Sequence, residues 1–552
     1  MWCTCAHGGH GQRGRAPRFR KASARPAPAA PRTGLGDRGR SWASRTHQDH
    51  RNSLRCRIWS PTGSLPRTSR GTPACLGGWW WPRRCDDGGV DATGARLPWG
   101  AGVLSAIGAV VSGRGRHPSR AVVIGFAAAV LVGTVLLDLP IATATGRSAG
   151  WAAALFTATS AVCVTGLAVV DTAGHWSVFG QVAIALLIQV GGLGIMTLAT
   201  LFTAAVSGRL KLRSRLMAQA ETKALEVTGI GRTVRDVVLF SLVCESVVAV
   251  VLTGRFALGY GEPLGRAVYL GVFHAVSAFN NAGFALWPDN LMRFVTDPWI
   301  CLPIALAVIV GGLGFPVAFE LLRSRRPRSW SLLTRITVGL TGVLLAAGTL
   351  AFVAGEWHNP RTLGPLDAAG KVLAGFFASV MPRTAGFNSL DVAGMEPSSW
   401  LVTDVLMFVG GGSAGTAGGI KVTTFGMLLF MVWAELRGRP RVDIGHRALG
   451  MATQRQAIAI TALSTAVIAL STLVLRRLTP HSLDSVLFEV ISAFATVGLS
   501  TGITATVPPA GQLLLIALMF VGRVGPLTLG SALALKERRR RYELPEQRMI
   551  VG

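Results

Sequence analysis

Long apolar segments with few charges fill the chain from Arg120 onward, and they constrain its fold more than any other feature. Half of the 552 residues are hydrophobic, 15% are charged, and the mean hydropathy is +0.45. A soluble domain covers its surface with charge, so this balance indicates a lipid bilayer as the solvent. Eight segments have the length needed to span a bilayer: 121–138, 177–206, 237–253, 298–322, 332–354, 400–434, 457–475 and 512–535. We therefore expect an all-α integral membrane protein.

The formal charge of +28 does not indicate a nucleic-acid partner. The basic residues lie in the first hundred positions and in short stretches between apolar segments, whereas a nucleic-acid binder carries them on folded polar faces. Every second connection between apolar segments is strongly basic, at 209–215, 323–328, 437–441 and 536–541. The positive-inside bias places these connections and both termini in the cytoplasm of a multi-pass plasma-membrane protein.

Residues 1–113 differ from the rest of the chain. They are rich in Arg, Pro, Gly and Ser, and they contain no apolar run long enough to span a bilayer. Such a segment cannot bury enough surface to offset its chain entropy, so we expect a disordered basic extension. A mis-assigned start is the other interpretation, with a native start codon near Val103 or Leu104.

The connections inside successive pairs of apolar segments repeat one pattern. An aromatic residue (Phe156, Phe273, Phe376 or Phe488) precedes a glycine by ten positions, and Leu or Phe follows the glycine. A second motif lies 23–27 residues beyond: Val190-GGLG, Val310-GGLG, Val409-GGGS and Val521-GRVG. A fixed spacing found four times predicts an internal repeat. We expect four pseudo-repeated helix–pore loop–helix units around a central pore, made of eight spans and four re-entrant pore helices.

The predicted units cover 114–208, 209–325, 326–440 and 441–541, followed by a cytoplasmic tail at 542–552. Non-helical backbone at membrane depth is tolerated only where protein buries it or water lines it. Four converging turns would present rings of carbonyl oxygens, which can replace the hydration shell of a monovalent cation. The predicted ion-selectivity filter comprises Thr165, Gly166, Ala282, Gly283, Ala385, Gly386, Val497 and Gly498. The hydroxyl side chains of Thr165, Thr384 and Thr496 are expected to support it.

The glycine repeat and the stretch Gly410-GGSAGTAGGIK-Val422 resemble the KtrB/TrkH/HKT superfamily of potassium transporters, and KtrB most, over about 115–540. The resemblance implies a K⁺-conducting pore with one filter glycine per repeat. In the plant branch, serine at the first of these positions is associated with Na⁺ selectivity, so four glycines favour K⁺. The resemblance also implies a homodimer and a separate cytoplasmic ring of nucleotide-binding subunits of the TrkA/KtrA (RCK) type.

No covalently bound cofactor is expected, and K⁺ is the substrate. Whether Na⁺ acts as a coupling or activating ion stays open. A secondary carrier for another monovalent cation or a small solute is the alternative, although carriers usually consist of two halves rather than four matching quarters. An enzyme is not expected, because the spans lack clustered nucleophiles, metal ligands or acid–base pairs.

Six glycines within 410–419 weaken the sixth span, since each costs about 1 kcal/mol relative to alanine. We expect an unwound segment there, and the resemblance implies that it is a gating loop that obstructs the pore. Lys421 either holds this loop or extends its amine to the cytoplasmic side. The predicted loop residues are Gly410, Gly411, Gly412, Ser413, Ala414, Gly415, Thr416, Ala417, Gly418, Gly419 and Lys421.

Arg523 stands where the first three repeats have glycine, some dozen residues into an apolar span. An arginine at mid-bilayer depth is expensive and faces a cavity or a partner. We expect it beneath the filter, in contact with carbonyls of 410–419. Glu245, also inside a span, is expected to pair with a basic neighbour. Asp171, Asp289 and Asp391 follow three filter glycines; they are either solvated loop residues or concentrate cations at an outer mouth.

Overall fold

The computed structural model describes residues 118–208, 230–439, 441–444 and 447–525. The chain divides into two units, 1–95 and 96–552, and all described residues belong to the second. The predicted extension at 1–113, the basic segments 209–215 and 536–541, and the predicted tail at 542–552 lie outside the described residues.

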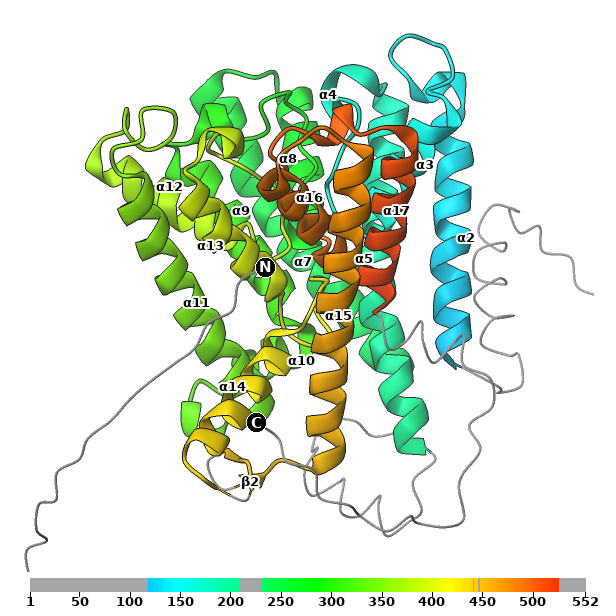
Figure 1. The fold of residues 1–552 in the computed structure, drawn as a ribbon. Coiled ribbons are helices and arrows are strands. Elements are labelled where there is room, and N and C mark those ends of the chain that lie inside the picture. The colour runs from blue at the N-terminus through cyan, green and yellow to red at the C-terminus, as the bar shows by residue number, and fades with distance from the viewer. Residues whose placement is uncertain (1–117, 209–229, 440, 445–446, 526–552) are drawn as a thin grey trace, which may run out of the picture. The chain divides into compact units, whose positions relative to one another are not determined.

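The described helices can be read as four successive groups, each a first helix, a helix of 12 to 16 residues, and a further helix or helix pair (Figure 1). In chain order the helices are α2 (Pro118–Asp138), α3 (Trp151–Val162), α5 (Val178–Gly208); α7 (Ile230–Tyr260), α8 (Leu264–Phe279), α9 (Pro298–Leu313) with α10 (Phe315–Arg323); α11 (Leu332–Glu356), α12 (Ala368–Val380), α13 (Pro397–Phe408) with α14 (Val422–Leu436); and α15 (Met451–Leu478), α16 (Leu483–Ala495), α17 (Pro509–Val524). We call the middle helix of each group, α3, α8, α12 or α16, a short helix. These four helices lie in the upper half of the view in Figure 1.

Minor elements connect these helices. They are η1 (Pro140–Ala142), α4 (Thr172–His175), η3 (Met292–Phe294), η4 (Pro327–Ser329), η5 (Val392–Gly394), η6 (Thr504–Thr506), and the strands β1 (Asp443–Ile444) and β2 (Arg447–Ala448). The two strands pair antiparallel between α14 and α15, with Asp443 opposite Ala448.

Within the described residues, three helices are long and apolar enough to cross a bilayer, at Thr233–Tyr260, Leu332–Glu356 and Met451–Leu478. The predicted span at 298–322 is bent, since α9 and α10 are apolar enough to cross a bilayer only as a pair. Gly314 takes φ +89°, and α9 and α10 meet there at 103°. The predicted span at 400–434 is divided into α13 and α14, which a non-helical loop separates. Glycine makes both breaks possible, because it adopts backbone angles that other residues avoid.

The short helices are anchored by the repeated aromatic side chains. Phe156, Phe273 and Phe488 are buried in the hydrophobic core, and Phe376 is partly buried against it. A large buried side chain stabilises a helix through its many van der Waals contacts. The repeated aromatic residue therefore fixes each short helix in a core to which several units contribute.

The second glycine motif lets each inner helix approach the short helix of its own unit. A Cβ atom on Gly191, Gly311 or Gly522 would lie within 3.0 Å of a carbonyl oxygen, on Val162, Phe279 or Phe494 respectively. Each of these carbonyls belongs to the residue four positions before a filter glycine. The corresponding glycine of the third unit, Gly410, contacts Gly418 in its own loop instead.

Replacing Gly311 with alanine should lower the melting temperature of the detergent-purified protein by several degrees, because its Cβ would push α9 away from the Phe279 carbonyl. Such overpacking costs about 1–3 kcal/mol. Gly342→Ala is the matched control: Gly342 lies in α11 with no atom within 4 Å of an added Cβ, so alanine should be neutral or stabilising there. Equal melting temperatures for the two variants would contradict the packing argument.

Candidate functional site

The four glycines of the predicted filter lie in turns that share one unusual backbone conformation. Gly166, Gly283, Gly386 and Gly498 have φ between +71° and +97°. The residue two positions earlier in each turn also has positive φ, although none of them is glycine. These residues are Val164 (+55°), Asn281 (+61°), Thr384 (+65°) and Thr496 (+51°). Non-glycine residues seldom adopt such angles, and a conformation that recurs in every unit points to a functional constraint.

The four turns meet in a closed ring. A Cβ on Gly166 would lie within 3.0 Å of the carbonyl oxygen of Ala282, the residue before the next glycine. The same relation joins Gly283 to Ala385, Gly386 to Val497, and Gly498 back to Thr165. Because each glycine touches the carbonyl of the following unit, a side chain at any of the four positions would overlap the backbone of its neighbour.

The repeated serine braces two of the turns directly. The Ser160 hydroxyl accepts a hydrogen bond from the Gly166 amide at 3.0 Å, and the Ser492 hydroxyl accepts one from Gly498 at 3.1 Å. Ser277 instead donates to the Phe284 carbonyl at 2.8 Å. Ser379, which is one place out of register, donates to the Leu345 carbonyl in α11 at 2.9 Å.

The threonine hydroxyls beside the ring make no hydrogen bond to it in the described part of the chain, and the support expected from them stays a prediction. The Oγ1 atoms of Thr165, Thr384 and Thr496 are buried and have no hydrogen-bond partner within the described ranges. A buried hydroxyl without a partner costs free energy, and each such group requires an explanation.

The residues between α13 and α14 form a non-helical loop, 409–421, which folds back on itself. Val409 and Ile420 pair as an isolated parallel bridge, and the Gly410 amide donates to the Ile420 carbonyl at 2.8 Å. The loop also fills the bend between α9 and α10: the Gly412 amide donates to the Gly312 carbonyl at 2.7 Å. Protein groups thus satisfy several of the backbone amides that the interrupted helix frees, as membrane depth requires.

Close backbone approach explains the high glycine content of this loop. A Cβ on Gly411 would lie 2.6 Å from the Gly312 carbonyl oxygen, and one on Gly415 would lie 2.9 Å from that of Gly311. Added Cβ atoms on Gly418 and Gly419 would meet Thr496 and Ala495, beside the fourth turn. The loop therefore lies against both the second and the fourth units.

Thr416 joins this loop to the second turn and to Arg523. Its hydroxyl donates to the Asn281 side-chain oxygen at 2.8 Å. The buried Arg523 guanidinium donates to the Thr416 carbonyl and, at 3.0 Å, to the Gly191 carbonyl. Arg523 therefore connects the loop to the first and fourth units. Lys421 is turned toward the loop, since its amine donates to the Ala417 carbonyl.

Arg383 is a second buried arginine, and sequence reasoning missed it. It lies three residues before Gly386, and its guanidinium donates to the Gly410 carbonyl at 3.2 Å, where the loop begins. None of Arg383, Lys421 and Arg523 makes an ion pair with a carboxylate in the part of the chain that the structure describes. A charge inside the repeated pattern, where the other units have Cys163, Asn280 and Ala495, was the signal that could have found Arg383.

Glu245 does not pair with a basic neighbour, so that expectation is wrong. Its carboxylate accepts hydrogen bonds from the side-chain amides of Gln189 in α5, at 3.0 Å, and Asn280, at 3.1 Å. Asn280 directly precedes Asn281, which bonds Thr416. The buried amides thus join α5, α7 and the second turn.

The three aspartates beyond the turns have local partners. Asp171 caps α4 by accepting from the Ala173 and Gly174 amides. Asp289 pairs with Arg293 at 2.7 Å, and hydrogen bonds from this arginine hold the pKa of the Asp289 carboxyl below its usual value. Asp391 pairs with Arg361 at 2.9 Å. The charge of two of the three is therefore compensated.

Comparison with known proteins shows the family. The family model described as TrkH, a cation transport protein, matches residues 119–538. The Ktr system potassium uptake protein B of Bacillus subtilis is 41% identical over 420 residues, which cover 76% of this chain and 94% of that protein. The potassium/sodium uptake protein NtpJ of Enterococcus hirae is 35% identical over 441 residues, covering 79% and 97%.

A solved structure shares the fold. The crystal structure of the potassium transporter TrkH from Vibrio parahaemolyticus superposes with a TM-score of 0.60 and 18% identity, and the match covers 78% of this chain and 90% of that one. The family match spans most of the chain, including all four turns and the loop. The chain belongs to the TrkH family of cation transport proteins.

Proposed function

We propose that this chain takes up K⁺ across the plasma membrane through a pore whose selectivity filter is the closed ring of glycine turns. The ring is the observation that carries the proposal, because four backbone segments from four units meet there through glycine–carbonyl contacts. Converging carbonyl oxygens can replace the hydration shell of K⁺. The hydroxyls of Thr165, Thr384 and Thr496 lie beside these turns, have no hydrogen-bond partner among the described residues, and offer further oxygen ligands.

Potassium is the proposed ion on two grounds. The Bacillus subtilis relative is named a potassium uptake protein, and all four filter positions are glycine. The Enterococcus hirae relative is named a potassium/sodium uptake protein. The second candidate is therefore a carrier of another monovalent cation, either Na⁺-selective or coupled to H⁺. Competition of Na⁺ with ⁸⁶Rb⁺ during uptake distinguishes the two.

The loop 409–421 is the proposed gate. It interrupts a span at membrane depth and lies against the second turn through Thr416 and against the fourth through Gly418. Hydrogen bonds from the buried Arg383 and Arg523 and from the partly buried Lys421 fix three of its carbonyls. These contacts hold the loop in one position until they are broken.

The proposed assembly follows from the family and from the basic connections. We propose a homodimer in the lipid bilayer, with both termini in the cytoplasm and an RCK-type nucleotide-binding ring docked there. On the opposite side, Asp171, Asp289 and Asp391 are the proposed outer mouth. Because Asp289 and Asp391 are paired with arginines, Asp171 carries most of any cation-concentrating effect.

Gly283→Ser and Gly386→Ser should each abolish ⁸⁶Rb⁺ uptake or remove the preference for K⁺ over Na⁺. A serine there is strained at φ +71° or +73°, and its Cβ overlaps the neighbouring carbonyl. The measurement is growth on low K⁺ and ⁸⁶Rb⁺ uptake in a K⁺-uptake-deficient bacterium. Gly146→Ser is the control, since Gly146 has φ +68° but open space around it.

Wild-type selectivity in both filter variants, at normal membrane levels, would refute the filter assignment. If the wild-type chain shows no uptake, the regulatory ring is co-expressed. Continued absence of uptake would then favour the carrier.

Arg523→Ala should raise ⁸⁶Rb⁺ uptake measured without the regulatory ring, because the loop loses its tether to Gly191 and the fourth unit. Arg477→Ala is the matched control, since it also removes one arginine but at the exposed end of α15. It should leave uptake unchanged. Unchanged flux through a folded Arg523→Ala protein would rule out the tether.

A further inference from the structure

One position of the short helices differs in chemistry among the four units. It directly follows the repeated aromatic residue and is occupied by Thr157, His274, Phe377 and Glu489. All four side chains are buried, with at most 1% exposure. The side chain at this position is therefore enclosed by protein in all four units, and its chemistry differs from one unit to the next.

In the second and fourth units this side chain reaches the chain just beyond the filter glycine. His274 Nε2 accepts a hydrogen bond from the Leu286 amide at 3.2 Å. Glu489 accepts one from the Ser500 hydroxyl at 2.9 Å and another from the Thr504 hydroxyl. Ser500 lies two residues after Gly498, so Glu489 is bonded directly to the segment that continues from the fourth turn.

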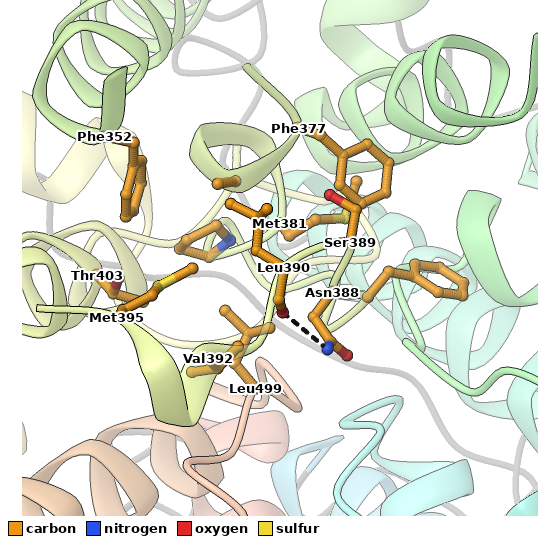
Figure 2. Close-up of a pocket in the computed structure, with 13 residues that line it drawn as sticks. Phe352, Phe377, Met381, Asn388, Ser389, Leu390, Val392, Met395, Thr403 and Leu499 are labelled. Atoms are coloured by element: carbon orange, nitrogen blue, oxygen red, sulfur yellow. Dashed lines mark hydrogen bonds between the residues drawn. The ribbon is translucent and has the colours of Figure 1, made fainter. Parts of the chain in front are cut away.

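The first and third units lack this link. Thr157 Oγ1 has no partner within the described segments. Phe377 lines a small cavity of about 20 Å³ together with Ser389 and Leu499, both close to filter glycines (Figure 2). The Ser389 hydroxyl also has no hydrogen-bond partner within the described segments. Glu489 is therefore the one carboxylate at this position.

The surroundings of Glu489 leave its charge uncompensated. It makes no ion pair with a basic group in the described part of the chain, and its two hydroxyl donors are neutral. A buried carboxylate is costly unless a cation lies near it. Neither Arg383 nor Arg523 compensates the charge of Glu489, because their guanidinium groups donate to the carbonyls of Gly410, Thr416 and Gly191.

We infer that Glu489 is a specificity-determining residue whose negative charge, held behind the fourth turn by Ser500 and Thr504, stabilises a cation in the ring. The inference rests on the proposed function, since it takes the ring to be the K⁺ site. A permeating K⁺ would then be the counter-ion that the protein does not provide. The charge acts from one unit only, so the field across the ring is asymmetric.

Glu489→Gln is the decisive variant, because glutamine keeps the shape and can hydrogen bond both hydroxyls but carries no charge. It should raise the KM for ⁸⁶Rb⁺ uptake about fivefold or more, with a smaller effect on the maximal rate, since the lost charge acts on ion occupancy. Glu489→Asp should retain most of the wild-type KM. Glu356→Gln, at a buried glutamate outside the short helices that also accepts bonds from neutral donors, is the matched control and should leave KM unchanged.

A wild-type KM for Glu489→Gln would overturn the inference, while uptake by the wild-type chain in the same assay would leave the proposed function intact. If Glu489→Gln cannot be recovered folded, the pair Glu489→Asp and Glu489→Asn replaces it, because these two side chains match in size and differ in charge. Glu489→Asn should have the higher KM; equal KM values for the two variants would overturn the inference. Absence of uptake by the wild-type chain, with the RCK-type regulatory subunits co-expressed, would refute the proposed function itself.

Discussion

Each glycine turn touches the next through a bare backbone contact, a glycine against the carbonyl oxygen before the following glycine. This contact leaves no space for side chains at the centre, so the centre is lined by peptide groups. The remaining structure keeps four such segments in place. Buried phenylalanines fix the short helices, serine hydroxyls fix the glycine amides of the first and fourth turns, and inner-helix glycines bring three short helices against their partners.

The third unit departs from this scheme, and its departure produces the loop. Gly410, the counterpart of Gly191, Gly311 and Gly522, contacts its own loop rather than a short helix. The inner helix is interrupted, and the freed amides bond the bend between α9 and α10. Arg383 and Arg523 then hold loop carbonyls from the third and fourth units. This interruption thus places a glycine-rich loop, held by two buried arginines, beside a ring built from all four units.

Sequence periodicity predicted the helical architecture and the turns, because each turn is encoded by residues within ten positions of its glycine. The family assignment is confirmed. Sequence did not reveal which surfaces the second glycine motif joins, nor the 103° bend at Gly314. Arg383 and Gly410 lie 27 residues apart, and Arg523 and Gly191 lie 332 apart. The first pairing lies within the third unit and the second joins the fourth unit to the first; both depend on tertiary packing, which sequence spacing alone does not specify. Glu245 illustrates the limit: its partners are amides on α5 and the second turn.

The most direct test of the central claim is anomalous scattering from Rb⁺ in crystals of the protein grown with RbCl in place of KCl. We predict a peak enclosed by the carbonyl oxygens of Thr165, Ala282, Ala385 and Val497, and loss of that peak when Na⁺ replaces Rb⁺. Ordered turns with no Rb⁺ between them, and a Rb⁺ peak elsewhere within the membrane-spanning helices, would contradict it.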